Sequence, residues 1–241
     1  MEALRPEISA GGFDRYDGTM QFYHRVNALL MPDFTVVDFG AGRGVNHIED
    51  QIKYRRELLK IKGKVRETIG VDVDNAVKTN PALDRSIVIT GSEIPLPDNS
   101  VDLILSDFTF EHLGDPAAIA RSFDRILKPG GWLCARTPNR FGYIALINRL
   151  LPDNAKSRIL HGAQPDRKEE DVFPALYRMN TFSDLRKVFP ESRYRHASYY
   201  WDASPSYYFG RRWVFSMFSI LHGLTPDVLK TMLMIFIQKR E

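Results

Sequence analysis

The hydrophobic positions between residues 36 and 136 form short apolar runs that alternate with amphipathic or polar segments. Runs of four to seven residues rich in Val, Ile and Leu, bounded by Gly, Pro or acidic residues, are typical of strands buried in a parallel sheet. Five such strands are predicted, at 36–39, 68–74, 86–90, 101–106 and 132–136. An α/β fold follows, because parallel strands need helical crossovers.

Helices are predicted wherever apolar positions recur at a spacing of three or four. The segment from Thr19 to Met31 has such a face and ends before Pro32. The charged stretch from Asn46 to Glu67 predicts a long exposed helix, and the segment from Asn75 to Asn80 a short one stopped by a proline. Further helices are predicted at 116–127, 144–151 and 181–188, and further strands at 192–200 and 232–238.

A glycine-rich segment follows the first strand and is the strongest local signal. Asp38 is followed by glycines at alternate positions, Gly40, Gly42 and Gly44, in a D-x-G-x-G-x-G pattern that also includes Ala41. Glycines at such a turn let the backbone approach a ligand closely, and the turn amides offer donors to an anionic group. A dinucleotide-binding G-x-G-x-x-G motif is not met, since Val45 occupies the place of its third glycine.

An acidic residue ends the second strand, within the sequence Val71-Asp72-Val73-Asp74. One carboxylate offers two oxygens, which suits the adjacent hydroxyls of a ribose. Asp72 is the predicted ribose ligand, beside Val73, and Asp74 is the alternative.

The glycine segment resembles motif I of the class I S-adenosylmethionine-dependent methyltransferases. Two further motifs are similar to a methyltransferase type 11-like subgroup: the L-P-x-x-D-like stretch 94–102 and the L-K-P-G-G turn at 127–131. The resemblance covers about residues 34–140. It implies a doubly wound, mostly parallel seven-stranded sheet with helices on both faces, and S-adenosyl-L-methionine as the cofactor.

The resemblance also assigns residues to the cofactor. The loop Asp38–Gly44 would hold its amino-acid end, and Ser106 and Asp107 would line it at the end of the fourth strand. An Asp that usually reaches adenine is replaced here by Thr90, so we expect Gly91 and Ser92 to stand in for it.

The methyl-transfer site is expected at residues 106–112, because ligands of doubly wound sheets lie beyond the carboxyl ends of the strands. His112 is the predicted general base and Glu111 its partner. Phe108, Asn139, Arg140 and Tyr143 are predicted to line the substrate pocket. An E-x-x-E-H metal motif is incomplete, since Phe108 occupies its first position, and no metal is expected.

We predict one methyltransferase domain over residues 1–241. It comprises a helical lead-in (1–33), a cofactor-binding core (34–140), a substrate-side insertion or lid (141–180), and C-terminal strands with an aromatic helix (181–241). Residues 199–218 hold many aromatic side chains, for which packing in the core or in a dimer is favoured, and which could also roof a substrate or touch a membrane surface.

Composition narrows the function classes. The net charge is only +3, with no polybasic block, so no nucleic-acid partner is expected. A single cysteine, Cys134, excludes an intramolecular disulfide and multi-cysteine zinc sites. Neither a signal peptide nor a transmembrane segment is predicted, which favours a cytoplasmic protein, a monomer or homodimer, with peripheral membrane contact left open.

The predicted reaction is methyl transfer from S-adenosylmethionine to a small-molecule, lipid or glycan acceptor, at oxygen. Two alternatives stay open: a non-catalytic S-adenosylmethionine-binding protein of the same fold, and a nicotinamide-dependent oxidoreductase on a related sheet. The missing third glycine disfavours the oxidoreductase.

Overall fold

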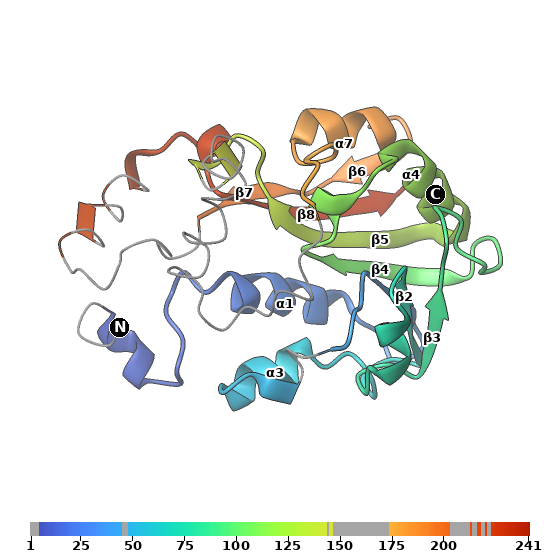
Figure 1. Ribbon diagram of the computed structural model, residues 1–241, viewed down its shortest axis with the longest axis horizontal. Helices are drawn as coiled ribbons and strands as arrows, with labels where there is room; N and C mark the ends of the chain where they lie inside the picture. Colours follow the sequence, from blue (N-terminus) through green and yellow to red (C-terminus); the bar gives the residue numbers. More distant parts are fainter. Residues whose placement is uncertain are drawn as a thin grey trace.

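The computed structural model describes residues 5–44, 48–143, 145–146, 174–202, 213, 216–217, 220 and 223–241. One mixed sheet forms its centre (Figure 1). The strands are β1 (Thr35–Phe39), β2 (Glu67–Asp72), β3 (Arg85–Val88), β4 (Val101–Asp107), β5 (Leu127–Pro138), β6 (Tyr194–His196), β7 (Tyr199–Trp201) and β8 (Met232–Lys239).

The strand order is β3-β2-β1-β4-β5-β8-β6, with β7 also paired to β8. Strands β1 to β5 run parallel, and β8 is antiparallel to β5. Both β6 and β7 pair with the same edge of β8, at its two ends. They are one predicted strand interrupted at Ala197 and Ser198, where Ser198 Oγ accepts a hydrogen bond from the Phe236 amide. The predicted doubly wound, mostly parallel sheet is confirmed, and this interruption raises the strand count to eight.

Helices cover both faces of the sheet (Figure 1). On one face lie α1 (Gly18–Leu29) and α3 (Lys53–Leu59), and on the other lie α4 (Pro116–Ile126) and α7 (Phe182–Val188). Short 3-10 helices are η1 (Pro6–Ser9), η2 (Asn75–Thr79), η3 (Phe110–His112) and η5 (Asp227–Leu229). Side-chain oxygens cap three of the helices: Asp17 caps α1, Asp115 caps α4 and Thr181 caps α7.

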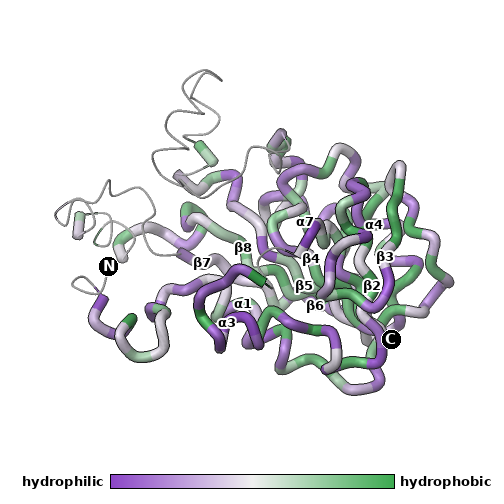
Figure 2. The backbone as a smooth tube through the Cα atoms, turned by 60° about the horizontal axis from the view of Figure 1, so that its bottom comes forward, coloured by the Kyte–Doolittle hydropathy of each residue, from purple (hydrophilic) through white to green (hydrophobic). Residues whose placement is uncertain are grey.

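The sheet separates two layers of buried apolar side chains. In Figure 2, hydrophobic residues of the chain are green and hydrophilic residues are purple. One layer packs alternate strand residues against α4 and α7, and Phe123 of α4 is its largest helical contribution. The other packs Leu105, Cys134 and Phe236 against Phe22 and Val26 of α1. Since successive strand residues point to opposite faces, these two layers tell which face each site residue emerges from.

The prediction of a long helix from Asn46 to Glu67 is wrong. Residues 45–47 lie outside the described part, and α3 covers only seven residues. Before it, the Asp50 carboxylate accepts hydrogen bonds from the Ile52 amide and from the Arg55 guanidinium, an arrangement that competes with helix. After it, Lys60 is already extended, with a ψ of 107°, and Gly63 takes a positive φ of 84° that is incompatible with a continuing helix.

The predicted short helix after β2 is present as η2, capped by Asp74 through the Ala76 amide. Most of the predicted helix 144–151, most of the insertion 141–180, and most of the aromatic segment 203–218 lie outside the described residues.

Candidate functional site

The loop after β1 is open to a ligand at one glycine only. Gly40, Gly42 and Gly44 all have positive φ, which glycine adopts without strain. A Cβ on Gly40 would lie 2.0 Å from Thr109 Oγ1, and one on Gly44 would lie 2.2 Å from Asn80 Oδ1. Around a Cβ on Gly42 there is nothing within 4 Å. The outer glycines are therefore needed for packing, and the middle one borders open space.

Asn80 fixes the loop from the opposite side, although it was not among the predicted residues. Its side-chain amide donates to the carbonyls of Ala41 (3.0 Å) and Gly42 (3.2 Å), and its Oδ1 accepts from the Ala82 amide. Asn80 is buried. The loop carbonyls are thus turned toward Asn80, which leaves the loop amides for other partners.

Asp72 joins the tip of β2 to this loop. Its Oδ2 accepts from the Gly42 amide at 2.8 Å, and its Oδ1 accepts from the Asp74 amide at 2.9 Å. Each carboxylate oxygen accepts more than one bond, so both retain capacity for ligand hydroxyls. The alternative residue, Asp74, caps η2 instead.

Three carboxylates, of Asp38, Asp72 and Asp107, lie at the carboxyl ends of three adjacent strands. Asp38 lies opposite Leu105 in the β1–β4 pairing, two residues before Asp107, so Asp38 and Asp107 emerge on the face covered by α1. Burial, and then the charges of Asp107 and Asp72, raise the pKa of Asp38 to about 7. This edge of the sheet therefore has a high density of negative charge.

Arg136 offsets part of that charge and was missed by the sequence prediction. Its guanidinium donates to both carboxylate oxygens of Asp107 at 2.7 Å, and to Thr19 Oγ1 of α1 at 2.9 Å. Although burial alone lowers the pKa of Arg136, the paired Asp107 raises it, so the guanidinium stays charged. A lone arginine inside an apolar strand was the available signal. The Tyr23 hydroxyl also contacts Asp107, at 3.3 Å.

Phe108 follows this ion pair in a strained conformation. Its φ is 55°, a rare value for a bulky residue, and the Arg136 guanidinium lies 4.6 Å from its ring centroid. The ring is 43% exposed. Strain of this kind concentrates at functional sites.

A second polar network lies on the opposite face. The Asn180 side chain donates to Thr137 Oγ1 (2.7 Å), and Thr137 donates to Glu111 Oε2 (2.8 Å). All three residues are buried, and burial raises the pKa of Glu111. The backbone carbonyl of Glu111 accepts from the amides of Leu176 and Tyr177, so the network holds the segment 174–180 against η3.

His112 lies beside this segment. Its Nδ1 is 3.1 Å from the carbonyl oxygen of Pro174. Because a carbonyl only accepts, the hydrogen of a neutral ring lies on Nδ1 and the lone pair on Nε2. The ring is partly exposed.

The remaining predicted residues are less closely grouped. Ser106 is buried, and its hydroxyl donates to the Phe39 carbonyl, at the start of the glycine loop. Val73 is 58% exposed at the tip of β2. Gly91 is exposed after β3 with open space at its Cβ position, and Ser92 is partly exposed.

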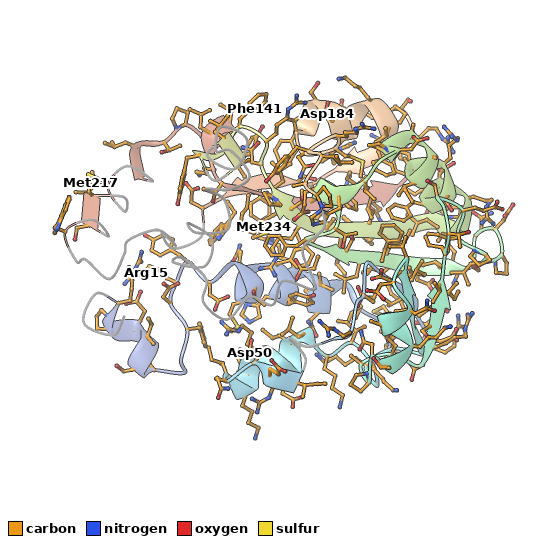
Figure 3. All side chains as sticks on the ribbon, in the orientation of Figure 1. Arg15, Asp50, Phe141, Asp184, Met217 and Met234 are labelled. Atoms are coloured by element: carbon orange, nitrogen blue, oxygen red, sulfur yellow. The ribbon has the colours of Figure 1, made fainter. Side chains whose placement is uncertain are left out.

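Of the predicted substrate residues, Asn139 has no exposed surface. Its side-chain amide donates to the carbonyls of Val228 and Lys230, which fixes the segment before β8. Arg140 and Tyr143 are partly exposed beyond the end of β5. Phe141, labelled in Figure 3, is 50% exposed in the same turn.

Hollows elsewhere on the surface contain none of these residues. One of about 450 Å³ lies between the turn at Gly11 and Gly12 and residues 51–57, and one of about 230 Å³ lies between α4 and α7. In the described part of the chain, no three His, Cys, Asp or Glu residues are grouped to hold a metal ion. Within the same residues, no helix is long and apolar enough to cross a membrane.

Comparison with known proteins agrees with this geometry. Residues 37–135 match the family model described as a methyltransferase domain. A probable S-adenosylmethionine-dependent methyltransferase of Mycolicibacterium smegmatis is 36% identical over 115 residues, which is 45% of this chain and 39% of that protein. Residues 37–135 are therefore similar to a methyltransferase domain, and the matched relative is described as S-adenosylmethionine-dependent.

Another curated relative is named for its acceptor. A malonyl-[acyl-carrier protein] O-methyltransferase of Coxiella burnetii is 28% identical over 113 residues, covering 47% of this chain and 36% of that protein. The matched region thus spans well under half of these curated relatives. The solved structure of a possible histamine N-methyltransferase from Thermotoga maritima has a TM-score of 0.55 at 16% identity, over 98% of this chain and 93% of that one, and supports the fold.

Proposed function

We propose that this chain transfers the methyl group of S-adenosylmethionine to a hydroxyl or carboxyl oxygen of a small-molecule, lipid or glycan acceptor. The observation that carries the proposal is the open space at Gly42 beside the Asp72 carboxylate. The amino-acid end of the cofactor would lie along the glycine loop, and its ribose hydroxyls would bind Asp72. An O-methyltransferase among the curated relatives supports an oxygen acceptor.

Methyl transfer from a sulfonium is an in-line displacement, so positioning contributes much of the rate. The acceptor oxygen forms a bond to the methyl carbon as the carbon–sulfur bond breaks, and the electron pair of that bond stays on sulfur. The products are a methyl ether or ester and S-adenosylhomocysteine.

His112 is the proposed general base. With Nδ1–H donating to the Pro174 carbonyl oxygen, Nε2 carries the lone pair that would take the proton from the methyl acceptor. Glu111 is a positioning residue: its backbone carbonyl accepts hydrogen bonds from the segment that contacts His112, and its side chain accepts one from Thr137. Phe108, Arg140 and Tyr143 would contact the acceptor; Asn139 would shape the pocket from within the protein.

The test is transfer of radiolabel from methyl-labelled S-adenosylmethionine into a fractionated cell extract. Label in an organic-soluble or polysaccharide fraction, released with the stability of an ether or ester, is the expected result. His112→Gln should bind the cofactor as the wild type does and lose roughly a hundredfold or more in rate. Cofactor binding without labelled product in any fraction would favour the non-catalytic alternative, and label in nitrogen-linked methyl groups would overturn the oxygen assignment.

A further inference from the structure

The charged side chains at the strand ends beside the proposed cofactor site carry a net negative charge. Asp72 and Asp107 are the last residues of β2 and β4, and Asp38 is the last but one of β1, which lies between them. In the described residues, Arg136 is the cation bonded to this group. The net charge of these four side chains is −2 when Asp38 is ionised and −1 when it is protonated. Tyr23 of α1 also faces the group, and burial raises its pKa, so it stays neutral.

The substrate and product of methyl transfer differ by one charge at sulfur. S-adenosylmethionine carries a sulfonium, an ammonium and a carboxylate, for a net charge of +1. S-adenosylhomocysteine carries a neutral thioether in place of the sulfonium, for a net charge of zero. A negatively charged site attracts the ligand with the extra positive charge more strongly. In a partly buried site this preference persists, because salt screens the electric field there only weakly.

We propose that this four-residue charge group biases the cofactor site toward the sulfonium cation and against the neutral product. Asp107 and Arg136 act as specificity-determining residues of opposite sign. Asp107 adds negative potential at the site, and Arg136 sets how much of it remains. The inference rests on the proposed position of the cofactor at the loop after β1.

The geometry makes the two residues a matched pair for a test. They are neighbours in the β4–β5 pairing and contact each other through both carboxylate oxygens. Removing either charge alone changes the net charge by one unit in opposite directions. Removing both restores the original net charge, in the same place and with side chains of similar size.

The measurement is the dissociation constant of each cofactor for the full chain, by calorimetry at pH 7.5. The selectivity is the constant for S-adenosylhomocysteine divided by that for S-adenosylmethionine. Asp107→Asn should lower the selectivity and Arg136→Gln should raise it, each roughly tenfold, the effect of one unit charge at a distance on the order of 10 Å and an effective dielectric constant of about 20. The double variant should return to within about threefold of the wild type. Residues with a purely structural role would weaken both cofactors alike and leave the selectivity unchanged, which would overturn the proposal.

A pH series on the wild type needs no substitution, should a variant fail to fold. Selectivity should rise between pH 5.5 and 7.5 as Asp38 ionises, and Asp38→Asn should remove that part of the rise. A flat wild-type profile would also overturn the proposal. Failure of the proposed function is separate: it would appear as normal selectivity without methylated product.

Discussion

The Gly42 amide donates a 2.8 Å hydrogen bond to the Asp72 carboxylate, so the loop after β1 and the tip of β2 form one unit. Asp74 lies two residues further on, and its carboxylate instead caps η2 by accepting a hydrogen bond from the Ala76 amide. These two acids are therefore a matched pair in which one variant tests cofactor binding and the other tests local structure.

Asp72→Ala should weaken S-adenosylmethionine at least tenfold, because hydrogen bonds to a charged group contribute about 1.5–3 kcal/mol each. Asp74→Ala should lose about 1 kcal/mol of stability as a missing cap and keep its affinity within about threefold. Calorimetric titration with thermal unfolding of both variants checks this. Equal affinity in the two variants would exclude Asp72 as a ribose ligand.

Glycine substitutions should separate packing from binding. Gly42→Ala meets open space, so it should cost only about 1 kcal/mol of stability for its positive φ, while the added methyl group blocks the cofactor. Gly44→Ala collides with Asn80 and should destabilise the protein by about 2 kcal/mol or more. Denaturant unfolding and cofactor titration give the two numbers. A fully active Gly42→Ala protein would contradict the proposal that the cofactor occupies the open space beside Gly42.

The raised pKa of Asp38 predicts a pH-dependent stability of the cofactor-free protein. The folded state keeps the proton up to about pH 7, whereas an unfolded Asp releases it near pH 4. Folding thus binds a proton, and this contribution is present below pH 4 and is lost as the pH rises toward 7. Relative to Asp38→Asn, the wild type should lose melting temperature as the pH rises from about 4 to about 7. Parallel curves for the two proteins would show that Asp38 has an ordinary pKa.

Removal of the Thr137 hydroxyl, which links Glu111 and Asn180, should change both the stability and the pH dependence of the rate. Thr137→Val keeps the shape of the side chain but leaves Glu111 and Asn180 without their shared partner, at a cost of about 1–3 kcal/mol. Thr137→Ser keeps the hydroxyl and is the control. The hydrogen bond from Thr137 lowers the pKa of Glu111, so its loss should raise that pKa. The pH–rate profile of the Val variant should therefore shift to higher pH. Unfolding curves and pH–rate profiles check both parts.

Local patterns predicted most of this fold. The strand ranges and the short element after β2 each depend on residues within a few positions of one another. The exposed helix 46–67 was wrong because Asp50 directs its neighbours into a turn, an effect that hydrophobic periodicity does not register.

The candidate site could be predicted only where its signal was local. The glycines and Asp72 follow from the strand–turn pattern. Asn80 contacts the loop from 38 residues away and Arg136 contacts Asp107 from 29 residues away, so neither partner is visible in a local window. Asp107 was predicted as a cofactor residue without the cation that occupies both its oxygens.

The bond from Arg136 to Thr19 has a practical consequence for anyone dissecting this protein. The matched family region starts at residue 37, yet α1, which ends at Leu29, supplies an acceptor for the guanidinium and the apolar cover over Cys134. A fragment that begins at the family boundary would expose apolar strand side chains to water. It would also remove the Thr19 hydroxyl, a hydrogen-bond acceptor of the buried Arg136 guanidinium. Expression of the minimal domain should therefore yield aggregated material, and the first thirty residues belong in any fragment intended for crystals.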